Sequence, residues 1–249
     1  MGNPSQLQRL PDGFLERGAS VTRLEAFVDA AFAFAVTLLV ISLDSMPSSI
    51  TSMVEALKGV PAFAASFAQI MIFWSAHATW SRRFGLDDQR SQRLGLLLVF
   101  LVLVYVYPLK ILFGGFFHWI SAGWIPQVAT INSVLDLKLM FIVYGIAFST
   151  LSLLVAALYR QALRAPVQPP LDAQEVHQSK VEIVAWRYSA LVALASMAFA
   201  LLLPDRPPGW LTGMPGMVYG LLGFTGMVVA RFAGAILPEG GSGKMGRTG

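Results

Sequence analysis

Six segments of this sequence are long and apolar enough to cross a lipid bilayer. A helix needs roughly 20 mainly apolar residues to span the hydrocarbon core, and within that core its backbone must satisfy its own hydrogen bonds. Residues rich in Pro, Gly, Ser and charge separate the segments, as in "SRRFGLDDQRSQR" and "PDRPPG". The predicted spans are 24–43, 54–80, 94–117, 134–159, 183–203 and 211–237. The sequence therefore predicts an all-α, polytopic membrane protein with six transmembrane helices.

The composition agrees with a membrane protein and excludes several other classes. Only 13% of the residues are charged, whereas a soluble domain carries about 25%. The chain has no cysteine, so it contains neither disulfides nor thiolate metal sites. A pI near 9.6 is compatible with nucleic-acid binding, but in a chain with six spans an excess of Lys and Arg is typical of cytoplasmic loops. We therefore expect membrane lipid as a partner and no nucleic acid.

The distribution of positive charge predicts the orientation of the chain, because Lys and Arg concentrate in cytoplasmic loops. With both termini inside, fourteen of the eighteen Lys and Arg residues face the cytoplasm. We therefore expect a multi-pass protein of the inner (plasma) membrane with both termini cytoplasmic. Its predicted parts are a cytoplasmic N-terminal segment over 1–22, a six-helix transmembrane channel domain over 23–237 and a flexible C-terminal tail over 238–249.

One loop and one span carry further expectations. The loop between the fourth and fifth spans contains Pro166, Pro169 and Pro170, which predict an extended cytoplasmic linker. In the last span Gly216 and Gly220 are four residues apart, a spacing that is typical of close helix packing in membranes.

Nothing in the sequence indicates an enzyme. The three histidines, His77, His118 and His177, lie in a span, an outer loop and an inner loop. The sequence has no HExxH motif, no paired carboxylates on one helix and no phosphate-cradling glycine loop. We therefore predict no catalytic residue, no metal and no cofactor.

The first span carries three charged residues, which are costly in lipid. Arg23 and Glu25 lie in its first turn, where long side chains reach the interface by snorkelling. Asp29 lies deeper and must face protein or water. Antiparallel packing of the second span brings His77 to a similar depth, so we predict a polar network of Asp29 and His77 that holds the helices together.

One stripe of the first span is apolar apart from a single hydroxyl. At about 100° per residue its members share one side of the helix, with Asp29 on roughly the opposite side. The members are Phe27, Ala30, Phe34, Thr37, Leu38 and Ile41. Packing against another helix is one explanation, with the threonine bonded to its own i−4 carbonyl. Around a symmetry axis, the same stripe would line a narrow apolar constriction that gates by dewetting.

The first two spans resemble the transmembrane protein 175 family of potassium-selective channels. The family signature is Arg, three residues, then Phe-Ser-Asp, followed by an apolar helix containing Thr-Leu-Leu. Here it reads "RLEAFVD" and "AVTLLVISL". In the second span the family pattern Phe-Trp-x-x-His reads "FWSAH". The size of the chain and the six-span layout are also similar to those of one bacterial subunit.

The resemblance implies a homotetramer in which the first helix of each subunit lines a pore for potassium or other monovalent cations. Signature and packing positions fall on Arg23, Phe27, Asp29, Trp74 and His77. Pore-lining positions fall on Phe34, Thr37, Leu38 and Ile41, with Thr37 at the position implicated in selectivity.

Two positions depart from the family pattern. The signature serine is Val28, and the first constriction position is Phe34 where the family more often has Ile or Leu. Both changes bear on conduction more than on fold. Two alternatives to a channel therefore stand beside it: a proton-coupled secondary transporter that uses Asp29 and His77, and a non-conducting membrane scaffold.

Overall fold

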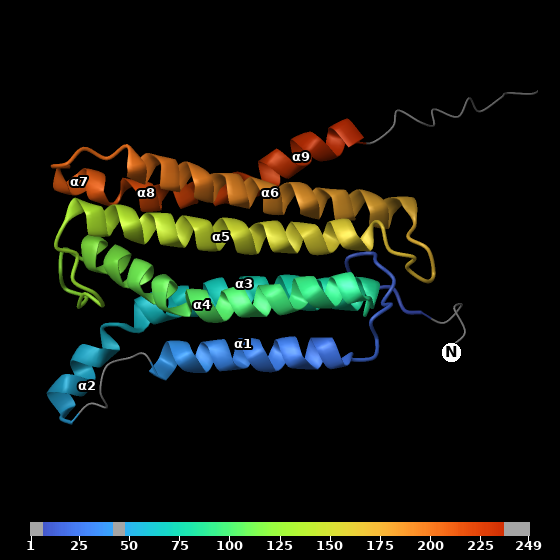
Figure 1. The fold of residues 1–249 in the computed structure, drawn as a ribbon, viewed down its shortest axis with the longest axis horizontal. Coiled ribbons are helices and arrows are strands. Elements are labelled where there is room, and N and C mark those ends of the chain that lie inside the picture. The colour runs from blue at the N-terminus through green and yellow to red at the C-terminus, as the bar shows by residue number, and fades with distance from the viewer. Residues whose placement is uncertain (1–6, 42–47, 237–249) are drawn as a thin grey trace, which may run out of the picture.

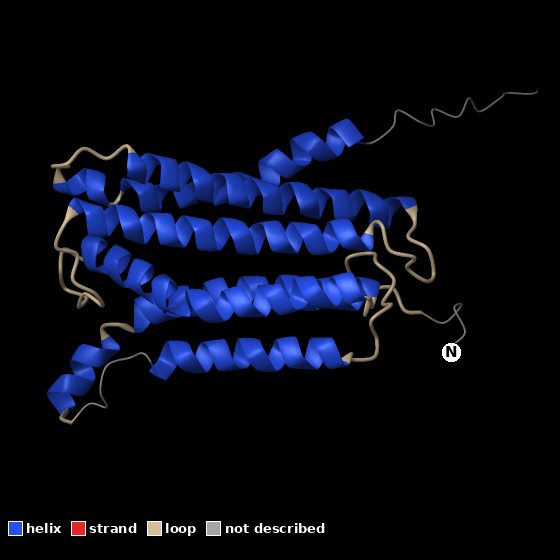
Figure 2. Ribbon diagram, in the orientation of Figure 1, coloured by secondary structure: helices blue, strands red, loops and turns tan. Residues whose placement is uncertain are grey.

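The described part of the protein is a bundle of long helices joined by loops (Figure 1; Figure 2). The computed structural model describes residues 7–41 and 48–236, with side chains over 7–40 and 48–232. The long helices are α1 (Arg23–Ile41), α3 (Val60–Phe84), α4 (Gln89–Ile120), α5 (Val134–Ala162) and α6 (Ala173–Leu201). The shorter elements are α2 (Ile50–Leu57), α7 (Gly209–Thr212), α8 (Met214–Met217), the 3₁₀ helix η2 (Val218–Phe224) and α9 (Thr225–Ile236). The predicted all-α fold is confirmed.

The spans also agree with a membrane protein. Among the described residues five stretches are long and apolar enough to cross a bilayer: α3, α4, α5, α6 and residues 214–232. With α1 these correspond to the six predicted spans. The N-terminal segment and the end of α9 lie towards the same end of the bundle (Figure 1), as an even number of crossings requires.

Two predicted boundaries are wrong, each for a local reason. The second span starts at Val60 instead of residue 54, because Gly59 and Pro61 separate α3 from the short α2. The predicted linker before the fifth span is shorter, because Asp172 starts α6 with a capping box to Glu175.

The last span is broken into α8, η2 and α9. Pro215 and five glycines between 213 and 226 weaken a continuous α-helix. Close helix packing through Gly216 and Gly220 is not observed in the subunit, since Gly220 is exposed and a Cβ there would meet nothing within 4 Å.

The helix α1 lies at one edge of the bundle, outside its core. The helices α5 and α6 pack along most of their length, α4 packs on α5, and α1 packs on α3 and α4 (Figure 1). Aromatic side chains fill the centre: Phe73 of α3 contacts Phe148 of α5 edge-on and Trp186 of α6, with ring centroids 5.7 and 5.6 Å apart. Among the described residues the neighbours of α1 lie on one side of it, and its other side is uncovered within the subunit.

A folded N-terminal segment, residues 7–22, precedes α1 and ties it to α3 and α6. Phe14 is fully buried against Phe84, and the guanidinium of Arg83 lies 4.3 Å from the Phe14 ring centroid. The N–H of Gly18 donates to the Arg82 carbonyl at 3.0 Å. A Cβ at Gly18 would overlap the Ser81 carbonyl oxygen, so only glycine permits this close approach to the end of α3.

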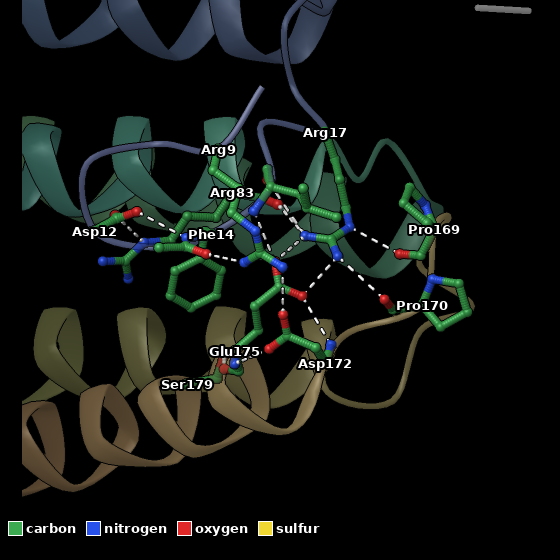
Figure 3. Close-up of polar contacts among 12 residues, drawn as sticks. Arg9, Asp12, Phe14, Arg17, Arg83, Pro169, Pro170, Asp172, Glu175 and Ser179 are labelled. Atoms are coloured by element: carbon green, nitrogen blue, oxygen red, sulfur yellow. Dashed lines mark hydrogen bonds and ion pairs between the residues drawn. The ribbon is translucent and has the colours of Figure 1, made fainter. Parts of the chain in front are cut away.

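A buried ion pair holds this segment to α6 (Figure 3). Both terminal nitrogens of Arg17 donate to the Glu175 carboxylate at 2.7 Å, and the two side chains are 2% and 1% exposed. The N–H groups of Leu15 and Asp172 donate to the same carboxylate at 2.8 and 2.9 Å. Arg17 also donates to the carbonyl of Pro169 at 2.9 Å. A buried pair is stable only when its remaining hydrogen bonds are made, and here they are.

Charged contacts continue around this pair. Arg83 donates to Asp12 and Glu182 at 3.0 and 3.1 Å. Arg9 donates to Asp172 at 3.0 Å. The pKa of Asp172 lies below its usual value because the Glu175 backbone N–H and the Arg9 guanidinium both donate to its carboxylate. Residues 7–22 are therefore a clamp that fixes where α1 begins.

We expect Glu175→Ala to lower the free energy of unfolding by about 3–5 kcal/mol, since it leaves Arg17 buried without its partner. The measurement is thermal or denaturant unfolding of the purified protein in detergent. Glu55→Ala is the matched control, because Glu55 is 56% exposed and its ion pair among the described residues is the surface pair with Lys58; its effect should stay below about 1 kcal/mol. Equal effects of the two substitutions would contradict the clamp.

Candidate functional site

The two sides of α1 differ sharply in burial. One side is fully enclosed by the bundle: Val28, Ala35 and Leu39 are 0% exposed and Phe32 is 1% exposed. The opposite side is open, with Phe27 52% and Phe34 55% exposed. Ala30, Ala33 and Thr37 are exposed on that same side. The spacing of 27, 30, 34 and 37 follows the helical repeat, so these residues form one continuous stripe, called here the open face of α1.

The predicted pore residues do not all share this face equally. Phe34 and Thr37 lie on it, whereas Leu38 is half-buried and packs against the core from its flank. Val40 is 44% exposed and was not identified from the sequence. Ile41 ends the helix, and its side chain lies outside the described residues.

The one hydroxyl of the open face is held in a fixed orientation. Thr37 Oγ1 donates to the Ala33 carbonyl one turn earlier at 3.0 Å, the local bond that threonine commonly makes in membrane helices. With its hydrogen used in this way, the oxygen presents only its acceptor lone pairs away from the helix.

Asp29 joins α1 to α3. The indole N–H of Trp74 donates to Asp29 Oδ1 at 2.8 Å, so the carboxylate meets a neighbouring helix on the side away from Phe34. Trp74 was predicted as a packing residue, whereas its bond to Asp29 was not predicted. A carboxylate–indole bond is charge-assisted and stronger than a neutral one.

The predicted polar network of Asp29 and His77 contains no direct hydrogen bond between these two residues. His77 is 1% exposed, and neither of its ring nitrogens has a hydrogen-bond partner among the described residues. Its ring lies against Trp80, with centroids 5.9 Å apart, and a Cβ at Gly95 of α4 would lie 3.6 Å from His77 Nε2. His77 therefore fills the space between α3 and α4, within electrostatic range of Asp29, while the hydrogen bond to Asp29 comes from Trp74.

The remaining signature positions divide between surface and core. Arg23 is exposed at the start of α1, as a snorkelling side chain should be. Glu25 is 8% exposed, and its Oε2 is buried with no partner among the described atoms; this carboxylate does not reach the interface. Val28 stands at the signature serine position and is fully enclosed by apolar neighbours, where a hydroxyl would need a partner.

The described side chains offer no place for a metal cofactor. In residues 7–40 and 48–232 no group of three or more His, Asp or Glu side chains could hold an ion. The chemistry available on the open face of α1 is that of apolar rings, one hydroxyl oxygen and backbone.

Comparison with known proteins identifies the class. The family described as "Endosomal/lysosomal potassium channel TMEM175" matches residues 23–108. This range includes α1, α2, α3 and the first 20 residues of α4. A protein named "Potassium channel" from Marivirga tractuosa is 32% identical over 202 residues, 78% of this chain and 81% of the relative. The family match over residues 23–108 covers the first two spans, where the signature residues lie.

Two solved structures share the fold. The potassium channel MtTMEM175, solved as a threonine-to-alanine variant with a Nanobody-MBP fusion protein, superposes with a TM-score of 0.75 at 29% identity. The overlap covers 92% of this chain and 100% of that one. A lysosomal potassium-selective channel TMEM175 homologue from Chamaesiphon minutus has a TM-score of 0.54 at 21% identity, over 83% and 96% of the two chains, and supports the fold alone.

These similarities place the bundle among multi-pass membrane proteins of an ion-channel class rather than among enzymes. Within that class, the chain belongs to the TMEM175 family of potassium channels.

The Trp74–Asp29 bond yields a stability prediction. Polar bonds between membrane helices contribute about 0.6–2 kcal/mol, so Trp74→Phe should lower the free energy of unfolding by an amount in that range while keeping most of the ring packing. Trp210→Phe is the control, since Trp210 is 65% exposed in α7. In a double-mutant cycle with Asp29→Leu the coupling energy isolates the bond; additive effects of the two substitutions would show that the bond contributes nothing.

Proposed function

We propose that the chain forms a homotetramer in which the open face of each α1 lines a central pore that conducts potassium. The observation that carries this proposal is the one-sided burial of α1: its inner side is packed to 0–1% exposure while Phe27, Phe34 and Thr37 face outwards from the subunit. A large exposed apolar stripe marks an interaction surface, and a helix at the edge of the subunit can be shared around an axis.

Lipid is the simpler cover for an apolar stripe, so the argument needs a second property of this face. The open face of α1 is not uniformly apolar, because Thr37 presents a hydroxyl oxygen one turn beyond Phe34. Cyclic assembly also generates closed rings from a heterologous interface. A ring of Phe34 side chains above a ring of Thr37 oxygens places an apolar constriction beside groups that replace part of an ion's hydration shell.

The proposed pore needs no glycine-carbonyl filter. Selectivity for potassium over sodium would be modest and would come from Thr37, while Phe34, with Leu38 and Ile41 further along, would form the gate that closes by dewetting. Asp29 and Trp74 would act only by holding α1 in place.

The orientation in the membrane follows from charge. Arg82, Arg83, Arg90 and Arg93 lie around the turn between α3 and α4, at the end of the bundle where residues 7–22 also lie (Figure 1). Positively charged ends remain in the cytoplasm. We infer that this end of the subunit lies on the cytoplasmic side of the plasma membrane and that both chain termini lie on the same side.

Phe34→Ala is expected to increase potassium flux into liposomes that contain the purified protein. Removing four rings lowers the dewetting barrier, and a decrease of about 1.4 kcal/mol raises the rate tenfold. Phe100→Ala is the matched control, because Phe100 is a phenylalanine of similar exposure, 60%, on α4 instead of α1; its flux should equal that of the wild type. The absence of potassium flux from both the wild type and Phe34→Ala would overturn the channel and leave the scaffold.

Thr37→Ala should reduce the preference for potassium over sodium. The hydroxyl contributes about one net hydrogen bond, 0.5–1.5 kcal/mol, which corresponds to a two- to tenfold smaller permeability ratio. Thr150→Ala is the control, since Thr150 on α5 makes the same i−4 bond, to Ile146, at 2.7 Å. The readout is the reversal potential in mixed potassium and sodium; an unchanged ratio would remove Thr37 from the selectivity mechanism.

The same liposomes distinguish the channel from a proton-coupled transporter that uses Asp29 and His77. A channel passes ohmic current without a proton gradient, whereas a transporter saturates and requires the gradient. Saturating, gradient-dependent flux that is lost in His77→Phe would replace the channel with the transporter.

A further inference from the structure

A second feature of the subunit lies at the end of the bundle opposite residues 7–22 (Figure 1). There a cavity of about 760 Å³ opens between α4, α5 and the stretch from α7 to η2. Its volume falls within the range of small-molecule sites, about 300–1,000 Å³. Neither the proposed pore nor the clamp uses any residue of its wall.

The cavity has the depth of one lipid leaflet. Its wall follows α5 from Val134, the first residue of that helix, to Tyr144, a stretch of about 15 Å at the rise of an α-helix. The hydrocarbon core of a bilayer is about 30 Å thick, so one leaflet contributes about 15 Å of it. Because α5 begins at this end of the bundle, the cavity runs from the membrane surface towards the middle of the bilayer.

The deep part of the cavity is apolar. Aromatic and aliphatic side chains of α4, α5 and η2 form it: Phe113, Leu137, Met140, Phe141, Tyr144 and Leu222. Gln69 and Tyr219 also belong to the wall, but the Gln69 Nε2 atom and the Tyr219 hydroxyl are shut off from solvent. Among the described residues no charged side chain lines this part. An empty apolar cavity forfeits dispersion contacts along its walls, and the apolar material that a membrane supplies is the acyl chain of a lipid.

The mouth of the cavity is polar and carries one charge of each sign. Gln127, Asn132 and Ser133 line it from the connection between α4 and α5, and Asp205 and Arg206 line it from the loop before α7. Asp205 and Arg206 are exposed, and neither takes part in an ion pair among the described residues. A headgroup with a phosphate and an ammonium group matches both charges, because guanidinium pairs with phosphate and carboxylate pairs with ammonium.

We propose that this cavity holds one acyl chain of a zwitterionic phospholipid from the leaflet at this end of the subunit. The chain lies among Phe113, Phe141 and Tyr144. The headgroup stays at the mouth, with its phosphate beside Arg206 and its ammonium group beside Asp205. An uncharged or a purely anionic headgroup matches at most one of these two charges. The site lies within one subunit, so it depends neither on the tetramer nor on conduction.

Phosphatidylethanolamine with a photoreactive diazirine near the end of one acyl chain tests the proposal directly. The full-length protein in maltoside detergent is irradiated with increasing amounts of this probe, and the labelled positions are mapped by peptide mass spectrometry. We expect labelling of the deep wall around Met140, Phe141 and Tyr144 that saturates near one probe molecule per subunit. Labelling that never saturates, or that is spread over exposed apolar positions such as Phe100, would overturn the proposal.

Two glycines permit the cavity to be filled by a side chain of the protein. A Cβ at Gly115 or Gly216 would meet its nearest neighbours at 3.9 and 3.7 Å, an ordinary contact distance, and both residues line the cavity. Gly115→Leu and Gly216→Leu should reduce labelling of the deep wall at least about tenfold. Gly220→Leu is the matched control, since a Cβ at Gly220 would meet nothing within 4 Å, and it should label like the wild type. Unchanged labelling in the folded, filled variants would contradict the site.

Competition in the wild type tests the headgroup separately from the acyl chain. Unlabelled phosphatidylethanolamine should displace the probe about two- to fivefold better than phosphatidylglycerol or diacylglycerol with the same chains, since exposed ion pairs contribute this much. Asp205→Asn should remove the advantage over phosphatidylglycerol, and Arg206→Gln should reduce the advantage over diacylglycerol. Arg231→Gln is the control, because Arg231 is exposed on α9 and lies outside the wall. Equal competition by the three lipids in the wild type would reject the zwitterionic headgroup.

Discussion

The structure of this subunit depends on how α1 is held by one side only. Its inner side, from Val28 to Leu39, is closed against α3 and α4 to 0–1% exposure. In lipid there is little hydrophobic drive between helices, so packing and a few polar bonds set helix position. The indole of Trp74 supplies one such bond through Asp29. With α1 fixed in this way, the direction in which Phe34 and Thr37 face is determined by the subunit before any assembly.

The charged residues of the subunit are structural more often than they are functional. Arg17 and Glu175 are the deepest ion pair among the described residues, and they connect the segment before α1 to the start of α6. Arg83 joins the same region through Asp12, Glu182 and the Tyr159 hydroxyl. These bonds fix the start of α1, while the open face carries almost no charge. Charged contacts at one end of α1 thus set the position of this helix, whereas its proposed conduction surface is apolar.

Much of this arrangement could be predicted from the sequence. The hydropathy gave the all-α fold, and the 3.6-residue repeat separated Phe34 and Thr37 from Asp29, as the structure also does. The burial of Leu38 and the exposure of Val40 could not be predicted, because a helical wheel gives the direction of each side chain but not the positions of the neighbouring helices. The Arg17–Glu175 pair spans 158 residues, and only the Asp172–Glu175 capping box left a local trace of it. The partner of Asp29 was missed because Trp74 and His77 lie about one turn apart on the same helix.

The central claim is that the open face of α1 faces water in a conducting pore, and single cysteines test it most directly. The chain contains no native cysteine, so each introduced thiol is the only one present. A charged, membrane-impermeant thiol reagent should block potassium flux through Phe34→Cys and Thr37→Cys. It should leave Phe100→Cys, on the exposed side of α4, unaffected. Block at Phe100→Cys with none at 34 or 37 would contradict the account.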